Sequence, residues 1–288
     1  MPSIPVLDST MHFEELGAAS DGATFVFLHG NPGSSHQWRA VIERVGAAHA
    51  LAPDLIGMGR SGKPELAYDF ADHARYLDAW FDAVGVERAV LVGHDWGGAL
   101  AFDWAARHPH RVLGIAFFES IVKPMEWADL SPQARARSEL VRTPGAGEAR
   151  VLATDAFIRQ AYTGGVLTPV EAADLDAYLA PFATPESRAP VLAWARQMPL
   201  GGEPKAVVER IEAYDQWLAT SDAVPKLLLT FEGSATLLID EAMAAWCAAS
   251  IAALEIVQGG EAGHHAQEDR PEAIAAEIER WAGRHGLR

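Results

Sequence analysis

The sequence predicts an α/β protein in which a mostly parallel central sheet is flanked by helices and interrupted by an inserted helical cap. Short β-rich runs alternate with helical patterns over residues 1–122, which is typical of a parallel sheet covered by helices. A second block of strand and helix patterns covers residues 218–288. Residues 123–217, between the two blocks, contain no convincing strand. We therefore expect an α/β core made of the two blocks and a cap formed by residues 123–217.

Apolar runs rich in β-branched and aromatic residues predict six strands. In chain order they are TFVFLHG (24–30), HALAPDL (49–55), AVLVGHD (89–95), RVLGIAFFES (111–120), KLLLTFEG (226–233) and ALEIVQGG (253–260). Segments with apolar residues at helical spacing predict helices between and after these strands. They are SSHQWRAVIERV (34–45), YDFADHARYLDAWFDAVG (68–85), GGALAFDWAARHP (97–109), DEAMAAWCAAS (240–250) and PEAIAAEIERWAG (271–283).

The expected cap is rich in Ala, Glu, Arg and Pro. Its prolines divide it into several short helical stretches, and the run TPGAGEA within it is typical of a loop. The chain contains no internal repeat and no low-complexity tract. The cap is therefore expected to be a folded insertion.

Composition excludes several classes of partner. The net charge of −16 and the pI near 5.0 argue against nucleic acid and against an anionic membrane surface, because the long-range field repels both. No apolar run approaches the roughly 18 residues of a membrane span. Cys247 is the single cysteine and cannot form an intrachain disulfide, and the N-terminal residues lack the pattern of a signal peptide. We expect a protein in a reduced, cytoplasmic setting, and its charge does not affect binding of small neutral molecules.

The stretch VGHDWGG places an acidic residue where many hydrolases carry a serine. Gly93-His94-Asp95-Trp96-Gly97 lies between a predicted strand and a predicted helix, which is the setting of a nucleophile elbow. Such a turn lifts the side chain at its apex into a pocket. Asp95 is at the apex, and the alternative is that it caps the following helix. The flanking glycines and the partners described below favour a nucleophile.

A carboxylate nucleophile indicates a particular chemistry. It is ionised at neutral pH and suits attack on saturated carbon, which gives an alkyl ester. Hydrolysis of that ester needs a base, and a histidine beyond the last strand is the expected one. The run GGEAGHHAQED offers His264 and His265, each of which could instead be a polar loop residue. Physical reasoning alone leaves the choice between them open.

The run LHGNPGSSHQW, at the end of the first predicted strand, is the second motif that indicates the site. Its tight loop could supply a backbone N–H to an oxyanion hole. The side-chain amide of Asn31 and the indole N–H of Trp96 are two neutral donors that could converge on a leaving anion such as a halide. The alternatives are an Asx turn for Asn31 and simple packing for Trp96.

These motifs make the chain similar to the haloalkane dehalogenases of the α/β-hydrolase superfamily. The resemblance runs through HGNPGSSHQWR, PDLIGMGRSGKP, VGHDWGGALAFDWAARHP, FFESIVKPMEWAD, YLAPFATPESRAPVLAWARQMPL, PKLLLTFEG and HHAQEDRPEAI, and so covers nearly the whole chain. It implies an α/β-hydrolase fold with Asp95 as nucleophile. Asn31 and Trp96 would bind the halide through their side chains and the oxyanion through their backbone N–H groups. In the family, two residues separate the catalytic histidine from a Gln-Glu-Asp run. Here that run is Gln267-Glu268-Asp269, so the resemblance implies that His264 is the base.

The acid of the triad has three candidates. Many α/β-hydrolases carry it after the strand KLLLTFEG, where Glu232 and Asp240 lie. In the dehalogenase subgroup that the chain resembles, the acid follows the preceding strand, where FFESIVKP places Glu119. We expect Glu119 to orient His264 and to stabilise its imidazolium form. The alternative for Glu119 is an ordinary solvated glutamate.

Two positions depart from the family's pattern. Gly233-Ser234 stands where Pro-Gly is usual, and His265 stands where an aromatic or bulky residue is usual. Both departures put the substrate range in question and leave the triad intact. The cap residues that could line the pocket are Phe157, Trp194, Pro199 and Leu200.

The sequence therefore predicts hydrolysis of a carbon–halogen bond in a small halogenated aliphatic compound, with water as the cosubstrate and halide as a product. No metal cluster or nucleotide fingerprint is evident, since GMGRSG lacks the third glycine of G-x-G-x-x-G. An epoxide hydrolase is the nearest rival, with Tyr162, Tyr178 and Tyr214 as candidate acids. A coelenterazine-type luciferase and a non-catalytic ligand receptor are further alternatives. The pattern does not predict the oligomeric state.

Overall fold

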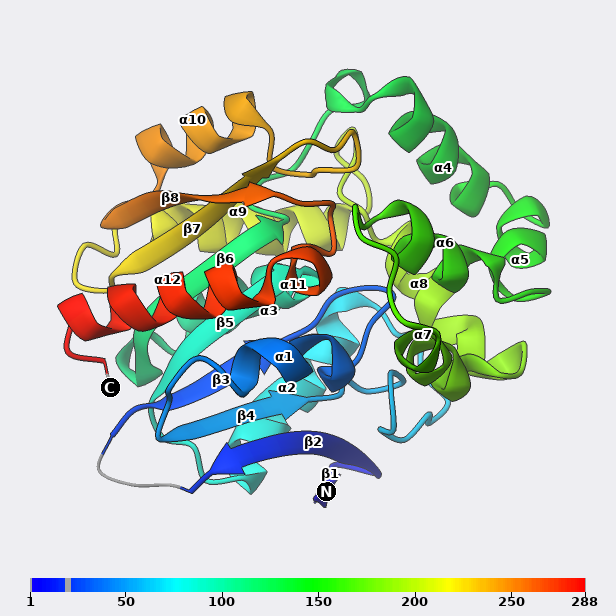
Figure 1. Cartoon of the computed structure of the whole chain (residues 1–288). Helices are drawn as coiled ribbons and strands as arrows, with labels where there is room; N and C mark the ends of the chain where they lie inside the picture. Colours follow the sequence, from blue (N-terminus) through cyan, green and yellow to red (C-terminus); the bar gives the residue numbers. More distant parts are fainter. Residues whose placement is uncertain (1, 19–21, 288) are drawn as a thin grey trace.

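The computed structural model describes residues 2–18 and 22–287, and an eight-stranded sheet runs through its centre (Figure 1). The strand order is β1-β2-β4-β3-β5-β6-β7-β8. The strands are β1 Ser3–Val6, β2 Ser9–Gly17, β3 Thr24–Leu28, β4 His49–Pro53, β5 Ala89–Asp95, β6 Val112–Ser120, β7 Lys226–Glu232 and β8 Leu254–Glu261. Neighbouring strands are parallel throughout the part of the sheet ordered β4-β3-β5-β6-β7-β8, so the expected mostly parallel sheet is confirmed.

The central strands are apolar throughout because helices cover both faces of the sheet. In β3, Phe25 and Phe27 belong to one apolar core, whereas Val26 and Leu28 belong to the other. Every residue of β5 is buried. Continuous apolar runs of this kind are typical of parallel strands buried on both faces, which is why the sequence identified them.

The N-terminal hairpin was not predicted from the sequence. β1 pairs with β2 and β2 pairs with β4, in both cases antiparallel, so the sheet begins two strands earlier than expected. Three residues of β2, Met11 to Phe13, are buried, and all the others are exposed or half-buried. A strand that packs only a short apolar segment lacks the continuous run by which the inner strands were recognised.

Helices form a layer on each side of the sheet. α1 Arg39–Ile42, α11 Ala266–Asp269 and α12 Pro271–Arg284 lie in front of it in Figure 1, and α2 Phe70–Ala83, α3 Trp96–Arg107 and α9 Lys205–Leu218 lie behind it. α10 Glu241–Ser250 adds Cys247 to the core on the α3 side. The expected helical flanks are therefore present. Within the described residues, no helix is both long and apolar enough to span a membrane.

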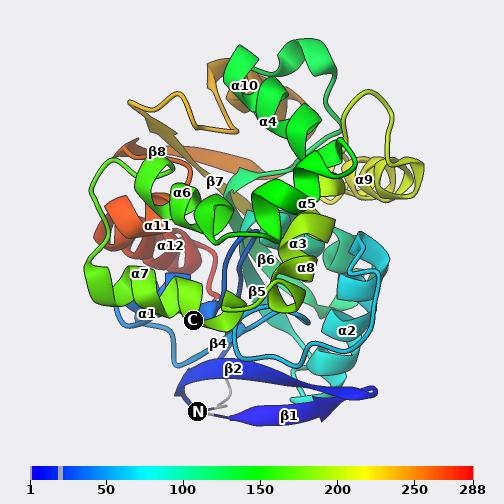
Figure 2. The same ribbon diagram turned by 90° about the vertical axis from the view of Figure 1, so that its right-hand side faces the viewer.

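Between β6 and β7 the chain forms short helices that cover one end of the sheet (Figure 2). They are η3 Trp127–Asp129, α4 Pro132–Arg142, α5 Ala146–Val151, α6 Ala156–Gly164, α7 Ala172–Leu179, η4 Ala180–Phe182, η5 Glu186–Arg188 and α8 Ala189–Arg196. The core has a further short turn in η1 Ser35–Trp38 and another in η2 Pro109–Arg111. Within residues 123–217, all of which are described, extended pairing is limited to isolated bridges at Leu200.

Helix α9 lies inside the expected cap range but packs against the core. Arg210 of α9 donates to Asp103 of α3 at 2.7 Å, and the rings of Tyr214 and Phe102 lie 5.5 Å apart. The boundary of the cap at residues 123–217 stays a prediction.

Candidate active site

Asp95 is at a sharp corner between β5 and α3. Its backbone has φ +54° and ψ −123°, a conformation that is costly for a residue with a Cβ. Its side chain makes no capping hydrogen bond to α3, so Asp95 does not have the helix-capping role considered as the alternative from the sequence. The adjacent glycines are required by packing, because a Cβ on Gly97 would lie 2.0 Å from the Leu28 carbonyl oxygen and one on Gly98 would lie 1.9 Å from Ser120 Oγ.

The Asp95 carboxylate lies between the loop after β3 and the histidine near the C-terminus. Oδ1 accepts a hydrogen bond from the Asn31 N–H at 2.8 Å, and Oδ2 lies 3.6 Å from His264 Nε2. A Cβ on Gly30 would lie 2.2 Å from Oδ1, so only glycine allows the loop to approach this closely. Burial works to raise the pKa of Asp95, but His264, His94 and the Asn31 N–H outweigh it and hold the pKa below its usual value.

His264 connects Asp95 to a second carboxylate. Its Nδ1 donates to Glu119 Oε2 at 3.0 Å while Nε2 faces Asp95. Burial would lower the pKa of His264, but pairing with Asp95 and Glu119 prevails and raises the pKa from 6.5 to about 9. The imidazole is therefore protonated at neutral pH when both carboxylates are charged.

Glu119 lies next to the last residue of β6, in the buried part of the strand, and has a positive φ of +48°. Its carboxylate accepts the N–H groups of Leu238 at 2.6 Å and Ile239 at 3.1 Å, both from the loop after β7. Glu119 is 1% exposed, so the alternative of a solvated glutamate does not describe its surroundings. The other candidates face elsewhere: Asp240 caps α10 through the Met243 N–H, and Glu232 is exposed.

The sequence did not single out several groups that hold His264. The Nε2–H of His94 donates to the His264 carbonyl oxygen at 2.8 Å, and the His264 N–H donates to Thr236 Oγ1 at 3.3 Å. His94 was visible in the motif as the residue before Asp95. Nothing in the sequence pattern identified Thr236 or the backbone donors to Glu119, because their role depends on how the loop after β7 folds.

Helix α8 of the cap covers Asn31 and Trp96. The Asn31 side-chain Nδ2 donates to the Val191 carbonyl oxygen at 3.1 Å, and its Oδ1 is buried without a partner among the described residues. The Trp194 ring lies 4.5 Å from the Trp96 ring. Because Val191 and Trp194 are three residues apart, they share one face of the helix. Trp194 therefore contacts the predicted site.

The other pocket candidates have contacts that do not involve Asn31 or Trp96 in the described structure. Phe157 is half-buried against the main apolar core and makes no ring contact with Trp96 or Trp194 in the described structure. Pro199 accepts the Met125 N–H at 3.0 Å, and Leu200 forms a bridge with Met125. Their role as pocket lining stays a prediction.

The two adjacent histidines have different surroundings. His265 is 3% exposed, and its ring lies 4.6 Å from the Tyr162 ring and 5.1 Å from the His264 ring. Burial and the charge of His264 lower the pKa of His265 well below its usual value. A neutral His265 therefore packs beside a protonated His264.

The three tyrosines proposed as acids for the rival reaction donate to groups within the protein. Tyr162 Oη donates to the Pro32 carbonyl oxygen at 2.6 Å, and Tyr214 Oη donates to the Ile121 carbonyl oxygen at 2.6 Å. Tyr178 Oη donates to Glu268. Each hydroxyl proton is thus engaged away from Asp95.

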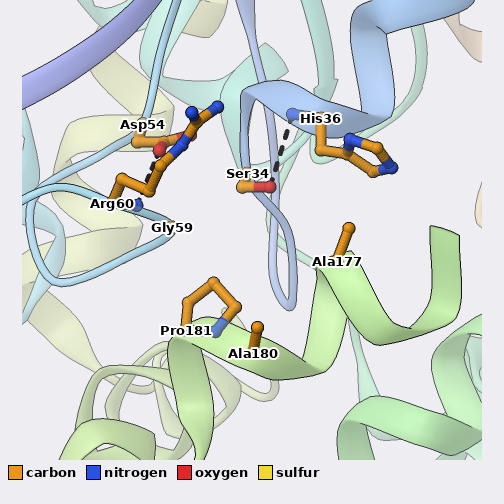
Figure 3. Close-up of a pocket in the computed structure, with 8 residues that line it drawn as sticks. All are labelled: Ser34, His36, Asp54, Gly59, Arg60, Ala177, Ala180 and Pro181. Carbon is orange, nitrogen blue, oxygen red and sulfur yellow. Dashed lines mark hydrogen bonds between the residues drawn. The ribbon is translucent and has the colours of Figure 1, made fainter. Parts of the chain in front are cut away.

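A cavity of about 470 Å³ lies between the cap and the core loops (Figure 3). Ala177, Ala180 and Pro181 line it from the cap, and Ser34, His36, Asp54, Gly59 and Arg60 line it from the core. None of these residues is one of the groups around Asp95. The Asp95 and His264 side chains nevertheless keep 12% and 19% of their surface accessible to water. Among the described residues, no cluster of three or more His, Cys, Asp or Glu residues is placed to hold a metal ion.

Sequence and structure comparisons with known proteins agree on one family. Residues 23–271 match the alpha/beta hydrolase fold family. A haloalkane dehalogenase of Mesorhizobium japonicum is 45% identical over 282 residues, covering 96% of this chain and 89% of that protein. A haloalkane dehalogenase of Bradyrhizobium diazoefficiens is 43% identical, with coverage of 96% and 92%. The crystal structure of the haloalkane dehalogenase DbeA from Bradyrhizobium elkani superposes with a TM-score of 0.94 at 43% identity, covering 99% of this chain and 98% of that one.

Proposed function

Because the chain belongs to the haloalkane dehalogenases of the alpha/beta hydrolase family, we propose that Asp95, His264 and Glu119 carry out its hydrolysis of carbon–halogen bonds. Asn31 and Trp96 hold the departing halide. The observation that supports this assignment best is the unbroken series of contacts from Asp95 through His264 to Glu119. The substrate is a small halogenated aliphatic compound, and the proposed reaction requires only water as cosubstrate.

In the first step, Asp95 Oδ2 attacks the carbon that carries the halogen. A C–O bond forms, the carbon–halogen bond breaks, and its electron pair leaves with the halide. The lowered pKa of Asp95 keeps the carboxylate ionised for this attack. The Asn31 N–H already donates to Oδ1. The second donor is the backbone N–H of Trp96, which follows Asp95 and is the first residue of helix α3. Both donors can stabilise negative charge on Oδ1 during the second step.

The halide leaves toward two neutral donors. Asn31 Nδ2 donates one of its two hydrogens to the Val191 carbonyl oxygen, so the second hydrogen is available to bind the halide. Trp96 is 3% exposed, which places its indole N–H in surroundings with little competing water. Neutral donors in such surroundings stabilise an anion while forming no ion pair that would retain it.

In the second step, water attacks the Asp95 carbonyl carbon and His264 Nε2 accepts the water proton. The resting pKa of about 9 reflects two carboxylates beside the imidazole. Alkylation turns Asp95 into a neutral ester and removes one of these charges, so the pKa of His264 falls and the neutral base becomes available. Collapse of the tetrahedral intermediate releases the alcohol, and the net products are an alcohol, a halide ion and a proton.

An isotope experiment tests the covalent route directly. With enzyme in excess over a brominated alkane in ¹⁸O-enriched water, the alcohol of the first turnover should carry ordinary oxygen from Asp95. The heavy oxygen should appear in the peptide that contains Asp95. An alcohol that carries ¹⁸O from the first turnover would mean that water attacks the substrate carbon, and the nucleophile assignment would be wrong.

A substrate panel tests the reaction class. Chlorinated, brominated and iodinated alkanes should yield halide and alcohol in equal amounts, and epoxides offered in parallel should yield little diol because the three tyrosine hydroxyls are engaged. Diol formation faster than halide release would favour the epoxide reaction. Multiple turnovers would exclude a receptor, and an assay for light emission with coelenterazine addresses the luciferase alternative.

A further inference from the structure

The segment that carries His264 is bound directly to the cap. The His265 N–H donates to the Gly165 carbonyl oxygen at 2.9 Å. Gly165 begins the irregular linker between α6 and α7, which is far from His264 in sequence. A helical insertion therefore reaches the residue next to the proposed base through a backbone hydrogen bond.

The two backbones lie in close contact at a pair of glycines. A Cβ on Gly263 would lie 2.3 Å from the Gly165 carbonyl oxygen, and a Cβ on Gly165 would lie 2.9 Å from His265 Cδ2. Side chains at either position would separate the cap linker from the His264 segment. The absence of a Cβ on both sides is what permits this contact.

Asp269 ties the same two segments together through its carboxylate. On the cap side, Oδ1 accepts the Thr168 N–H at 2.7 Å, and both oxygens lie 3.0 Å from the Leu167 N–H. On the core side, Oδ2 accepts the Gly263 N–H at 2.8 Å. Gly263 immediately precedes His264, so one carboxylate binds the cap linker and the backbone beside the base.

We propose that Asp269 is a positioning residue that holds His264 in register with Asp95 by fastening the His264 segment to the cap linker. Hydrogen bonds from backbone N–H groups to a carboxylate are charge-assisted and stronger than bonds between neutral groups. They restrain the residue on the N-terminal side of His264, while the bond from His265 to Gly165 restrains the C-terminal side. This inference rests on the proposed role of His264 as the base for ester hydrolysis.

The two chemical steps separate this role from a general effect on folding. Attack by Asp95 does not use His264, whereas ester hydrolysis requires its Nε2 to meet a water beside the Asp95 carbonyl carbon. A base displaced by about 1 Å can lower a rate by about a hundredfold. Loss of the Asp269 carboxylate should therefore slow hydrolysis and leave halide release in the first turnover unchanged.

The experiment compares Asp269→Asn with Asp129→Asn in rapid-mixing assays on a brominated alkane. Asp129 also accepts a backbone N–H in the cap, from Glu126 at 2.8 Å, but lies outside the His264 segment and serves as the matched control. For Asp269→Asn we expect a full halide burst at the rate of the unmodified enzyme and a steady-state rate that is lower by roughly ten- to a hundredfold. The alkyl adduct on Asp95 should accumulate in intact-mass spectra. Asp129→Asn should show both steps unchanged.

A second variant acts from the cap side. Thr168→Pro removes the N–H that forms the 2.7 Å bond and leaves Asp269 and the His264 segment intact, so it should show the same pattern with a smaller effect. If the melting temperature shows that Asp269→Asn does not fold, Thr168→Pro alone tests the positioning role. Equal slowing of both steps, or no slowing of hydrolysis in folded variants, would overturn the proposal.

A His264→Phe arm distinguishes this inference from the mechanism on which it rests. If His264→Phe continues to turn over, the base assignment fails and the role of Asp269 fails with it. If His264→Phe stops after one halide per site while folded Asp269→Asn turns over normally, only the positioning role is wrong.

Discussion

The His264 imidazole donates from Nδ1 to Glu119 Oε2 at 3.0 Å, across 145 residues of sequence. The Glu119 carboxylate is itself fixed by the N–H groups of Leu238 and Ile239. Its orientation is therefore set before any substrate binds. One glutamate thus aligns the imidazole and supplies a charge that favours its protonated form.

Replacing Glu119 with Gln should lower steady-state turnover by orders of magnitude, because the amide keeps the shape of the carboxylate but removes the charge that stabilises imidazolium. The first-turnover burst of halide should persist. Rapid-quench measurement of halide and alcohol separates the two steps.

Asp240→Asn is the matched control for Glu119→Gln. Asp240 caps α10, and asparagine caps a helix about as well as aspartate does, so Asp240→Asn should leave both stability and turnover nearly unchanged. A larger loss of activity in Asp240→Asn than in Glu119→Gln would place the acid after β7.

The raised pKa of His264 predicts a specific pH dependence of stability. The folded protein holds a proton on His264 up to about pH 9, whereas the unfolded chain releases it near 6.5. The stabilisation from this proton is complete below pH 6.5 and disappears as the pH rises through 9, and its size is on the order of a few kcal/mol. Urea unfolding at pH 6 and pH 9.5 should show this loss relative to His264→Phe. A stability difference between the two proteins that does not change with pH would contradict the assigned pKa.

Removing the Asn31 side-chain amide should weaken halide binding and dehalogenation together. Chloride, bromide or iodide should perturb the fluorescence of Trp96 in the unmodified protein, and Asn31→Ala should raise the halide concentration needed for that change. The chain has nine tryptophans, so Trp127→Phe, in the cap, serves as a control that should retain the response. Normal halide affinity in Asn31→Ala would remove Asn31 from the donor pair.

Lys226 predicts a stability effect that is separate from the chemistry. It is fully buried, and its ammonium group donates to the carbonyl oxygens of Ser221, Val224 and Ala252 at 2.8, 3.0 and 2.7 Å. Lys226→Met leaves these acceptors unsatisfied and should lower the free energy of unfolding by about 2 to 4 kcal/mol. Denaturant titration of Lys226→Met beside the exposed Lys205→Met would measure it. Equal stability of the two variants would show that the three bonds contribute little.

Sequence patterns predicted the parts of the fold that have strong periodicity. The inner strands were recognised because residues such as Phe25 and Val26 are buried on opposite faces of the sheet. The hairpin of β1 and β2 was missed because only a short part of it packs against the core. The packing of α9 on α3 depends on tertiary contacts such as Arg210 with Asp103, which no local pattern contains.

The residues of the candidate site were found from the sequence to the extent that they lie in contiguous motifs. Asp95, Trp96, Asn31 and His264 each stand in a short recognisable run, and their placement follows from the ends of β3 and β5 and the segment after β8. Glu119 required the family resemblance, since three acidic residues competed on sequence alone. The supporting groups, such as Thr236 and the backbone that binds Asp269, depend on loop conformations that spacing does not encode.

The hydrogen bond from the Asn31 amide to Val191 joins the proposed halide donor to the cap. The donor belongs to a core loop, but the acceptor that fixes its rotation belongs to α8. Exchanging the cap between related chains would therefore transfer part of the anion site together with the walls of the pocket. Selection for new substrates that alters residues 189–196 should change the relative rates for chloride, bromide and iodide even when Asn31 and Trp96 are untouched. Under the proposed role of Asn31, leaving-group preference and substrate shape are linked traits, and they should evolve together.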